Sequence, residues 1–217
     1  KLIMKYIKIL SVILLVYTAS AGFLFDVPRL PILNETIRVL YFHVPMWFSM
    51  IFLLLLSSIN AYRFISTKNN KYDLKSYNYA HVGVYFGILG IITGMIWANY
   101  TWGTYWTNDP KLNGSAIGLL IYFGYFILRN SVDDESKKAK ISSVYNVFAF
   151  SMLIPLIFIL PRLTDSLHPG NGGNPGFNVY DLNAQLRIVF YPAVIGFICL
   201  GLWITDIKEK IQKLNNN

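Results

Sequence analysis

Apolar residues gather into runs of about 20 residues separated by short polar stretches, and this pattern limits the possible folds most strongly. A helical run of that length spans the hydrocarbon core of a bilayer, whereas a transmembrane β-barrel shows short segments of alternating hydrophobicity. Charged residues make up 14% of the 217-residue chain, well below the roughly one quarter of soluble domains. The sequence therefore predicts an all-α integral membrane protein.

We expect six transmembrane helices in a single membrane domain, residues 1–217, because no internal repeat divides the chain. The predicted spans cover residues 7–25, 44–65, 79–98, 110–128, 144–160 and 188–204. The fourth begins where Asp109 and Pro110 form an N-cap followed by proline at the first helical position. A signal peptide cleaved after Ala19-Ser20-Ala21 is an alternative for the first run. That run continues to Phe25, however, which favours a retained helix.

Basic residues fall mainly on one side of the predicted membrane. Of the 19 Lys and Arg residues, fourteen lie near the termini and the loops after the second and fourth spans, and five lie on the other side. Such a bias of Lys and Arg marks the cytoplasmic side. It predicts cytoplasmic N- and C-termini, and it accounts for the net charge of +8 without a nucleic-acid partner.

Two further features of the sequence exclude classes of function. Cys199 is the single cysteine, so the chain contains neither an intrachain disulfide nor a CxxC redox or zinc site. The apolar centres of the predicted spans contain no Asp, Glu, Lys, Arg or His. Because ion-coupled carriers and proton pumps usually place ionisable groups there, we look for function at the outer ends of the spans.

The segment that leads into the second span places an imidazole beside an indole. Thr36, Leu40, His43 and Trp47 follow helical spacing, with Asn34 as the expected cap. Histidine and tryptophan also occur at membrane boundaries as ordinary interfacial residues. The spacing alone therefore leaves a structural and a ligand-binding role open.

The loop predicted after the third span is rich in aromatic residues. Three of the five tryptophans fall within ten residues there: Trp97, Trp102 and Trp106. An interfacial aromatic belt explains one or two of them, but not their crowding with Tyr105 around Gly103. A platform of Trp and Tyr, with a glycine that permits close approach, suits a flat aromatic ligand.

A Gly- and Pro-rich loop follows the fifth span, and His168 begins it. Two outward histidines beside an aromatic platform match the bis-imidazole ligation of a porphyrin iron. Asp109 is expected to cap a helix rather than act as a catalytic acid. The third histidine, His81, lies at the cytoplasmic end of the third span and is expected to be structural.

Together these residues resemble the heme exporter protein C family (CcmC) of bacterial cytochrome c maturation. The resemblance rests on His43-Val44-Pro45, on Trp102-Gly103-Thr104-Tyr105-Trp106 followed by Asp109, and on His168, and it covers nearly the whole chain. The sequence departs from the family pattern at Asn108, where another Trp is usual, and at Asn113. The last loop also lacks the Trp pair expected upstream of its histidine.

The resemblance implies a protein, not an enzyme, that holds heme b at the periplasmic face. His43 and His168 would be the axial iron ligands. The other residues that it assigns to heme are Trp47, Trp102, Gly103, Tyr105, Trp106 and Asp109. Arg162 is our candidate partner for a propionate, with Arg38, Lys111 and Arg187 as rivals, because Arg forms strong charge-assisted hydrogen bonds with carboxylates.

The resemblance further implies a location in the bacterial inner membrane and delivery of heme to a periplasmic, CcmE-like heme chaperone. An ABC-type complex (CcmA/CcmB-like) and a small single-span subunit (CcmD-like) would be partners. One alternative is a cytochrome c synthetase subunit, although such chains usually have more than the three histidines present here. The other is a translocase for heme or another solute. A diheme oxidoreductase would need four axial ligands.

Overall fold

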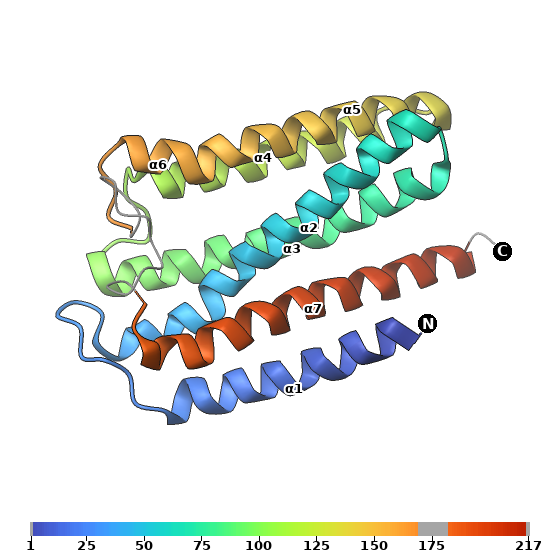
Figure 1. Ribbon diagram of the computed structural model, residues 1–217. Helices are drawn as coiled ribbons and strands as arrows, with labels where there is room; N and C mark the ends of the chain where they lie inside the picture. Colours follow the sequence, from blue (N-terminus) through green and yellow to red (C-terminus); the bar gives the residue numbers. More distant parts are fainter. Residues whose placement is uncertain (1, 169–181, 216–217) are drawn as a thin grey trace.

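The computed structural model describes residues 2–168 and 182–215, and its long helices lie side by side in a bundle (Figure 1). In this part of the chain, six helical segments are long and apolar enough to cross a membrane. They contain, in order, α1 (Leu2–Leu24), α2 (Leu40–Thr67), α3 (Asn70–Trp102), α4 (Pro110–Asn130), α5 (Glu135–Ile154) and α7 (Ala184–Asn215). This confirms the predicted all-helical fold of a multi-pass membrane protein.

Short helical elements extend two of these segments. A 3₁₀ helix, η1 (Asn34–Val39), leads directly into α2. Asn34 does not cap it as expected, since Leu33 takes the N-cap position and no side chain caps the helix. After α5 the chain makes a π-helical turn, η2 (Pro155–Ile159), and then α6 (Leu160–Leu163). The carbonyl of Leu156 in this turn lies against Gly114 of α4, where a Cβ atom has no room.

The helices pack as neighbouring pairs around α2. α1 packs against α7, α2 against α3 and α4 against α5, while α2 also contacts α5 and α7 (Figure 1). Both chain termini lie at one end of the bundle, which we call the terminal end. The opposite, distal end contains residues 25–39, 103–109 and 160–168. The Gly- and Pro-rich loop expected after His168 lies outside the described residues.

A row of glycines lets α2 and α3 approach closely. Their connection is only Lys68 and Asn69, much shorter than the predicted loop, and the Asn69 side chain caps α3. Four glycines of α3 face α2, and a Cβ atom on any of them would come within 2.7–3.0 Å of an α2 side chain. The pairs are Gly83 with Leu54, Gly87 with Met50, Gly90 with Trp47 and Gly94 with His43. Small residues at a helix interface permit such close packing in membrane proteins.

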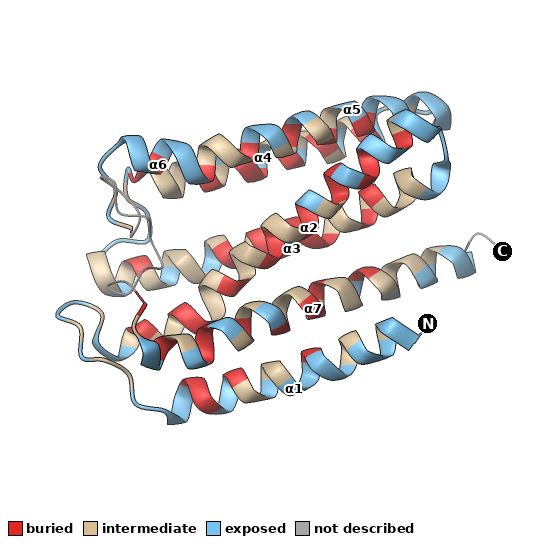
Figure 2. Ribbon diagram, viewed as in Figure 1, coloured by how far each residue is buried: buried red, intermediate tan, exposed pale blue. Residues whose placement is uncertain are grey.

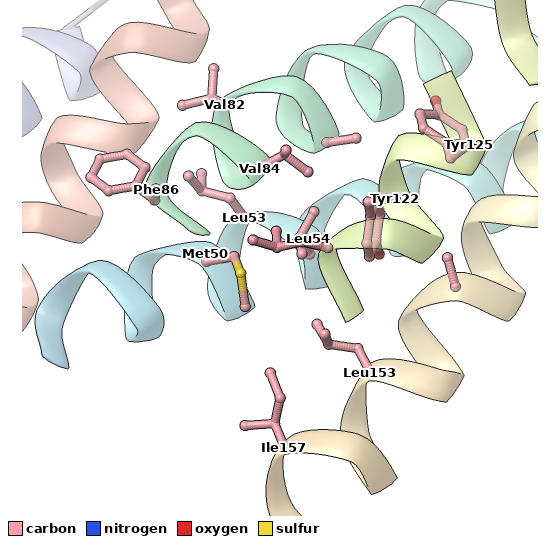
Figure 3. Close-up of a cluster of buried hydrophobic side chains, with 13 residues drawn as sticks. Met50, Leu53, Leu54, Val82, Val84, Phe86, Tyr122, Tyr125, Leu153 and Ile157 are labelled. Atoms are coloured by element: carbon pink, nitrogen blue, oxygen red, sulfur yellow. The ribbon is translucent and has the colours of Figure 1, made fainter. Parts of the chain in front are cut away.

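The apolar core lies between the middle segments of α2, α3, α4 and α5 (Figure 3). Its members include Met50, Leu53 and Leu54 of α2 and Tyr122 and Tyr125 of α4, all of them buried. Many residues on the outward faces of the bundle are exposed, including much of α1 (Figure 2). Large apolar side chains are among them, such as Ile3, Ile13 and Val16 of α1. Such an exposed apolar surface is what lipid chains would cover.

Towards the terminal end, polar side chains of different helices satisfy one another. Arg129 of α4 donates two hydrogen bonds to the Asp73 carboxylate of α3, at 2.8 and 2.6 Å. The Asn146 amide of α5 donates to the Ser57 and Ser76 hydroxyls, each at 2.7 Å. These contacts link α2, α3, α4 and α5 through buried or partly buried polar groups.

Candidate functional site

His43 lies in the first turn of α2, and its ring faces α3. His43 Nδ1 is 3.0 Å from the Thr93 hydroxyl oxygen. The same hydroxyl lies within hydrogen-bond distance of the Leu89 and Gly90 carbonyls, at 2.8 and 3.1 Å, and when it donates to either of them its oxygen accepts a hydrogen from Nδ1. A neutral imidazole with its hydrogen on Nδ1 carries its lone pair on Nε2. The contact with Thr93 thus favours the tautomer in which Nε2 carries the lone pair.

The His43 ring is also held by shape and by aromatic contacts. A Cβ atom on Gly94 would lie 2.7 Å from His43 Cε1, so only glycine leaves room for the ring. Trp47 and Trp97 contact the ring edge to face, with centroids 6.4 and 5.8 Å away. The indole of Trp97 in turn donates a hydrogen bond to Thr36 of η1, at 3.2 Å.

Helix α3 continues to Trp102, four residues beyond the predicted span, so Trp97 and Trp102 are helical rather than in a loop. Gly103 ends the helix with φ +78°, and its N–H donates to the Asn99 carbonyl at 3.1 Å. A Cβ atom on Gly103 would meet nothing within 4 Å. The left-handed cap therefore explains this glycine, and within the described part of the chain no other protein group approaches its Cβ position closely.

Asp109 caps α4, as expected, and its side chain also binds the segment that carries His168. Its side chain accepts hydrogen bonds from the backbone N–H groups of Lys111 and Leu112, at 2.8 and 3.3 Å, which caps α4. Its second oxygen accepts from the Ser166 hydroxyl and the Leu167 N–H, both at 2.8 Å. The residue is only 3% exposed. One buried carboxylate thus joins the start of α4 to the segment after α6.

His168 donates to this same carboxylate. Its Nδ1 lies 3.0 Å from Asp109 Oδ1. Burial alone would raise the pKa of the Asp109 carboxyl, but the hydrogen bond and charge of His168, together with the Leu167 and Ser166 donors, hold that pKa well below its ordinary value. An ionised carboxylate can only accept, so Nδ1 of His168 carries a hydrogen and Nε2 is again the potential ligand. Histidine ligands of metals typically have such a partner.

The end of α3 brings the two histidines into one region. Trp97 contacts His43, and Trp102, five residues later, contacts the His168 ring edge to face at 5.1 Å. Five residues of α-helix span about 7.5 Å. In residues 2–168 and 182–215, no group of three or more His, Cys, Asp or Glu side chains could hold a metal ion, so a protein-only metal cage is not formed there.

The remaining aromatic residues of the loop are accessible. Tyr105 is 55% exposed and Trp106 is 37% exposed. Trp106 donates through its indole N–H to Asn113 Oδ1 at 3.2 Å, and the Asn113 amide donates to Asn108 Oδ1 at 2.7 Å. The two residues that depart from the family pattern therefore form a hydrogen-bonded pair that holds Trp106 in place.

The three arginines near the site contact backbone carbonyls of different segments. Arg38 donates to the Gly22 and Phe25 carbonyls, both at 2.7 Å, and so secures the end of α1. Arg187 donates to the Leu182 carbonyl at 2.7 Å. Arg162 is exposed on α6, with a long contact of 3.4 Å to the Phe158 carbonyl.

His81 is remote from this region, in the half of α3 nearer the terminal end. Its ring contacts the rings of Tyr77, Tyr85 and Phe126, with centroids 5.6, 4.9 and 5.4 Å away. Its buried Nδ1 has no hydrogen-bond partner among the described residues. The structure therefore separates His81 from the other two histidines.

Sequence reasoning missed Thr93, Gly94 and Ser166 as parts of this site. Thr93 and Gly94 lie inside an apolar span, where neither residue type stands out. Their signal is the spacing of Gly83, Gly87, Gly90 and Gly94, which marks the face of α3 that packs closely on another helix. Nothing in the sequence marks Ser166, because its role depends on a loop that folds back onto Asp109.

Comparison with known proteins gives the family. The family model described as "Heme exporter protein C" matches residues 1–216. The chain is 30% identical to a heme exporter protein C of Bradyrhizobium diazoefficiens over 83% of this chain and 68% of that protein. It is 25% identical to the one of Paracoccus denitrificans over 82% of this chain and 74% of that protein. A cytochrome c biogenesis protein CcsA of Pelargonium hortorum is 37% identical, but over only 39% of this chain and 26% of that protein. The chain thus belongs to the heme exporter protein C family.

Proposed function

We propose that this protein binds heme b as cargo at its distal end, with His43 and His168 as the two axial ligands, in the maturation of c-type cytochromes. The observation that carries this proposal is that the two imidazoles have the same kinds of neighbours. Each has Nδ1 bound to a protein oxygen, and each contacts a tryptophan at the end of α3. Two nitrogen donors from segments 125 positions apart are what bis-histidine heme ligation needs.

The surrounding residues fit the same ligand. Trp47 and Trp102 supply aromatic surface next to the histidines, and Tyr105 and Trp106 supply exposed aromatic surface. Aromatic side chains bind flat apolar rings through burial and through edge or face contacts. Asp109 acts through His168 rather than by contact with the porphyrin. Arg162 is the proposed partner for a propionate, because it is exposed at the same end and guanidinium groups pair well with carboxylates.

In this proposal the bundle acts as one membrane domain in a bacterial inner membrane, with both termini in the cytoplasm and the distal end in the periplasm. The bias of Lys and Arg supports that orientation. The protein would hold heme for a periplasmic heme chaperone of the CcmE type. An ABC-type complex like CcmA/CcmB and a small single-span subunit like CcmD would act with it. Its task is transfer of the bound cargo, and we assign no catalytic residue.

The second candidate is a subunit of a cytochrome c synthetase, which would attach heme to an apocytochrome without an intermediate chaperone. The partial match to a CcsA protein favours it. That match covers a quarter of the CcsA protein, whereas the heme exporter proteins of Bradyrhizobium diazoefficiens and Paracoccus denitrificans are matched over two thirds or more of their length. Reconstitution with an apocytochrome, with and without the chaperone, separates the two candidates.

The direct test is an optical spectrum of the detergent-purified protein from a heme-replete host, oxidised and reduced. We expect a Soret band and the low-spin spectrum of bis-histidine heme. His43→Ala and His168→Ala should each shift the spectrum towards a five-coordinate or weak-field form and block formation of the loaded chaperone. Added imidazole should partly restore the spectrum. A wild-type protein without a Soret band would contradict the proposal.

The orientation is tested separately with single cysteines after replacement of Cys199. Thr104 and Ser136 are both exposed, the first at the distal end and the second at the terminal end. Thr104→Cys should react with an impermeant thiol reagent added to intact cells with a permeable outer membrane. Ser136→Cys should react only after the inner membrane is disrupted. The reverse pattern would place the site on the cytoplasmic side.

A further inference from the structure

Each imidazole of the proposed site has Nδ1 within hydrogen-bond distance of a protein oxygen, and that oxygen differs between the two histidines. For His43 this is the hydroxyl oxygen of Thr93, and for His168 it is a carboxylate oxygen of Asp109. The acceptor matters because a hydrogen bond from Nδ1–H to an anion increases the electron donation of Nε2. A neutral hydroxyl does so to a smaller extent.

The Thr93 oxygen is a weak acceptor. Its hydroxyl is neutral, and its hydrogen is directed to carbonyls of its own helix, at 2.8 Å to Leu89 and 3.1 Å to Gly90. No acidic side chain forms a hydrogen bond or an ion pair with His43 or Thr93 in residues 2–168 and 182–215. The position of the His43 ring depends instead on the narrow space above Gly94 and on the Trp47 and Trp97 rings.

Asp109 is a strong acceptor that cannot move away from His168. Five donors point to its two oxygens: the Lys111 and Leu112 N–H groups, His168 Nδ1, the Ser166 hydroxyl and the Leu167 N–H. Five donors on one side chain require a carboxylate, since a carboxylic acid would present a hydrogen of its own. Ser166 also accepts from the His168 N–H at 3.1 Å, which ties the backbone of the loop to the same cluster.

We propose that the two ligands have different tasks: His168 anchors the heme through the Asp109 carboxylate, and His43 is the ligand exchanged first when the cargo leaves. Asp109 and Thr93 are then the positioning residues that set this order. The inference rests on the proposed function, because it assigns tasks within that bis-histidine site.

The exchange is balanced without a redox partner or a base. The bond between the iron and His43 Nε2 breaks, and a bond between the iron and a neutral nitrogen of the acceptor, such as an imidazole, forms on the same face. His43 keeps its Nδ1 hydrogen on Thr93 and regains the Nε2 lone pair. His168 stays bound on the opposite face, so the cargo is held throughout the exchange.

The first experiment uses the heme-free protein. ¹⁵N NMR of the histidine-labelled full-length chain should show the Nδ1–H tautomer for both His43 and His168. Thr93→Val keeps the shape of the side chain, and it should release the tautomer of His43 alone. Asp109→Asn keeps an oxygen that can cap α4, and it should alter His168 alone. A change at the wrong histidine would overturn the assignment of the positioning residues.

The second experiment measures heme loss from the loaded protein to excess apomyoglobin. His168→Ala should lose heme faster than His43→Ala, because the ligand that remains is the weaker one. Asp109→Asn should accelerate loss on the order of 10–100-fold, as for other hydrogen-bond partners of metal ligands, and Thr93→Val should accelerate it less. His81→Ala is the matched control and should match the wild type.

The outcomes separate this inference from the function on which it rests. If the wild type retains heme but His43→Ala loses it as fast as His168→Ala or faster, the proposed order is wrong while the bis-histidine site stands. If Thr93→Val accelerates loss as much as Asp109→Asn, the assigned difference between the two acceptors is wrong. If the wild type retains no heme, the proposed function itself fails.

Discussion

Asp73 and Asp109 are both acidic residues with little exposed side chain, but they lie at opposite ends of the bundle in different surroundings. At the terminal end, Asp73 pairs with Arg129 across two helices, and the guanidinium also lies 4.9 Å from the centre of the Tyr77 ring. At the distal end, Asp109 accepts from a helix start and from the loop that carries His168. The first carboxylate completes a contact between helices, whereas the second orients the imidazole of His168, a proposed heme ligand.

The difference teaches how to separate a structural polar group from a functional one in this fold. At the terminal end, the Arg129 guanidinium and the Asp73 carboxylate form their hydrogen bonds with each other. The distal end instead combines two histidines, each with Nδ1 next to a protein oxygen, with exposed Trp and Tyr rings. Changes at the terminal end should therefore reduce stability with little effect on heme, and changes at the distal end should do the reverse.

The largest expected effect on stability is at the terminal end. Arg129→Met leaves Asp73 without its partner, and removal of one member of a buried ion pair costs about 3–5 kcal/mol. We expect the lower end of that range, because the two side chains are 11% and 13% exposed. Unfolding of the detergent-solubilised protein measures the loss, and the double variant Asp73→Asn with Arg129→Met should recover part of it. If the fraction that stays folded loses the heme spectrum, the terminal end also affects heme binding, and the contrast between the two ends is wrong.

Gly94→Ala tests the packing that holds His43. The added Cβ atom would lie 2.7 Å from His43 Cε1, and overpacking of this kind costs about 1–3 kcal/mol. We expect the ring to move and the low-spin heme spectrum to weaken. Gly83→Ala is the matched control, since its Cβ atom would lie 3.0 Å from Leu54, away from the site. Equal effects of both variants on the spectrum would show that helix packing in general, rather than the His43 position, controls heme.

Trp102→Ala should weaken heme retention more than Trp106→Ala. Trp102 contacts His168, whereas Trp106 is 37% exposed and held mainly through Asn113. Loss of aromatic burial and ring contacts is worth about 1–3 kcal/mol, so both variants should bind heme more weakly rather than lose it entirely. A heme titration of the purified variants measures the difference. If either variant fails to reach the membrane, that tryptophan serves as an interfacial anchor.

The smallest expected effect is that of His81→Ala on heme. This ring lies among Tyr77, Tyr85 and Phe126 in the half of α3 nearer the terminal end, so the optical spectrum and delivery should be unchanged. A modest loss of stability is expected, because the aromatic contacts disappear. If His81→Ala abolishes heme binding while His43→Ala and His168→Ala do not, the proposed site is at the wrong end of the protein.

The sequence was most informative where one physical cause dominates. The number of long apolar helices and the cap at Asp109 follow from hydropathy and from local capping chemistry, and both are confirmed. Helix ends were less predictable: α3 extends to Trp102 and begins at Asn70, because helices can continue beyond the apolar run that marks a span. The sequence did not predict that Gly103 forms the left-handed cap of α3, and its proposed role in the approach of a ligand stays a prediction.

What the sequence could not predict depends on contacts between distant segments. The pairing of His43 with Thr93 requires the close approach of α2 and α3, and the pairing of His168 with Asp109 requires a loop to fold back over the start of α4. Likewise, Asn108 and Asn113 look like mere departures from a pattern until their hydrogen bond is seen. The roles of His43 and His168 as ligands stay a prediction.

The close packing of α2 on α3 also bears on the order in which the protein is made. His43, Thr93, Gly94 and Trp97 all belong to this helical hairpin, which the ribosome completes before it translates Asp109 or His168. Because N-terminal parts of a chain generally fold first during synthesis, the nascent protein passes through a stage with one imidazole already in place. The second arrives only after two more helices have been inserted. If His43 and His168 are the ligands, as proposed, heme captured during that interval would be held by a single weak ligand and would be free to leave, which would protect the growing chain from premature loading.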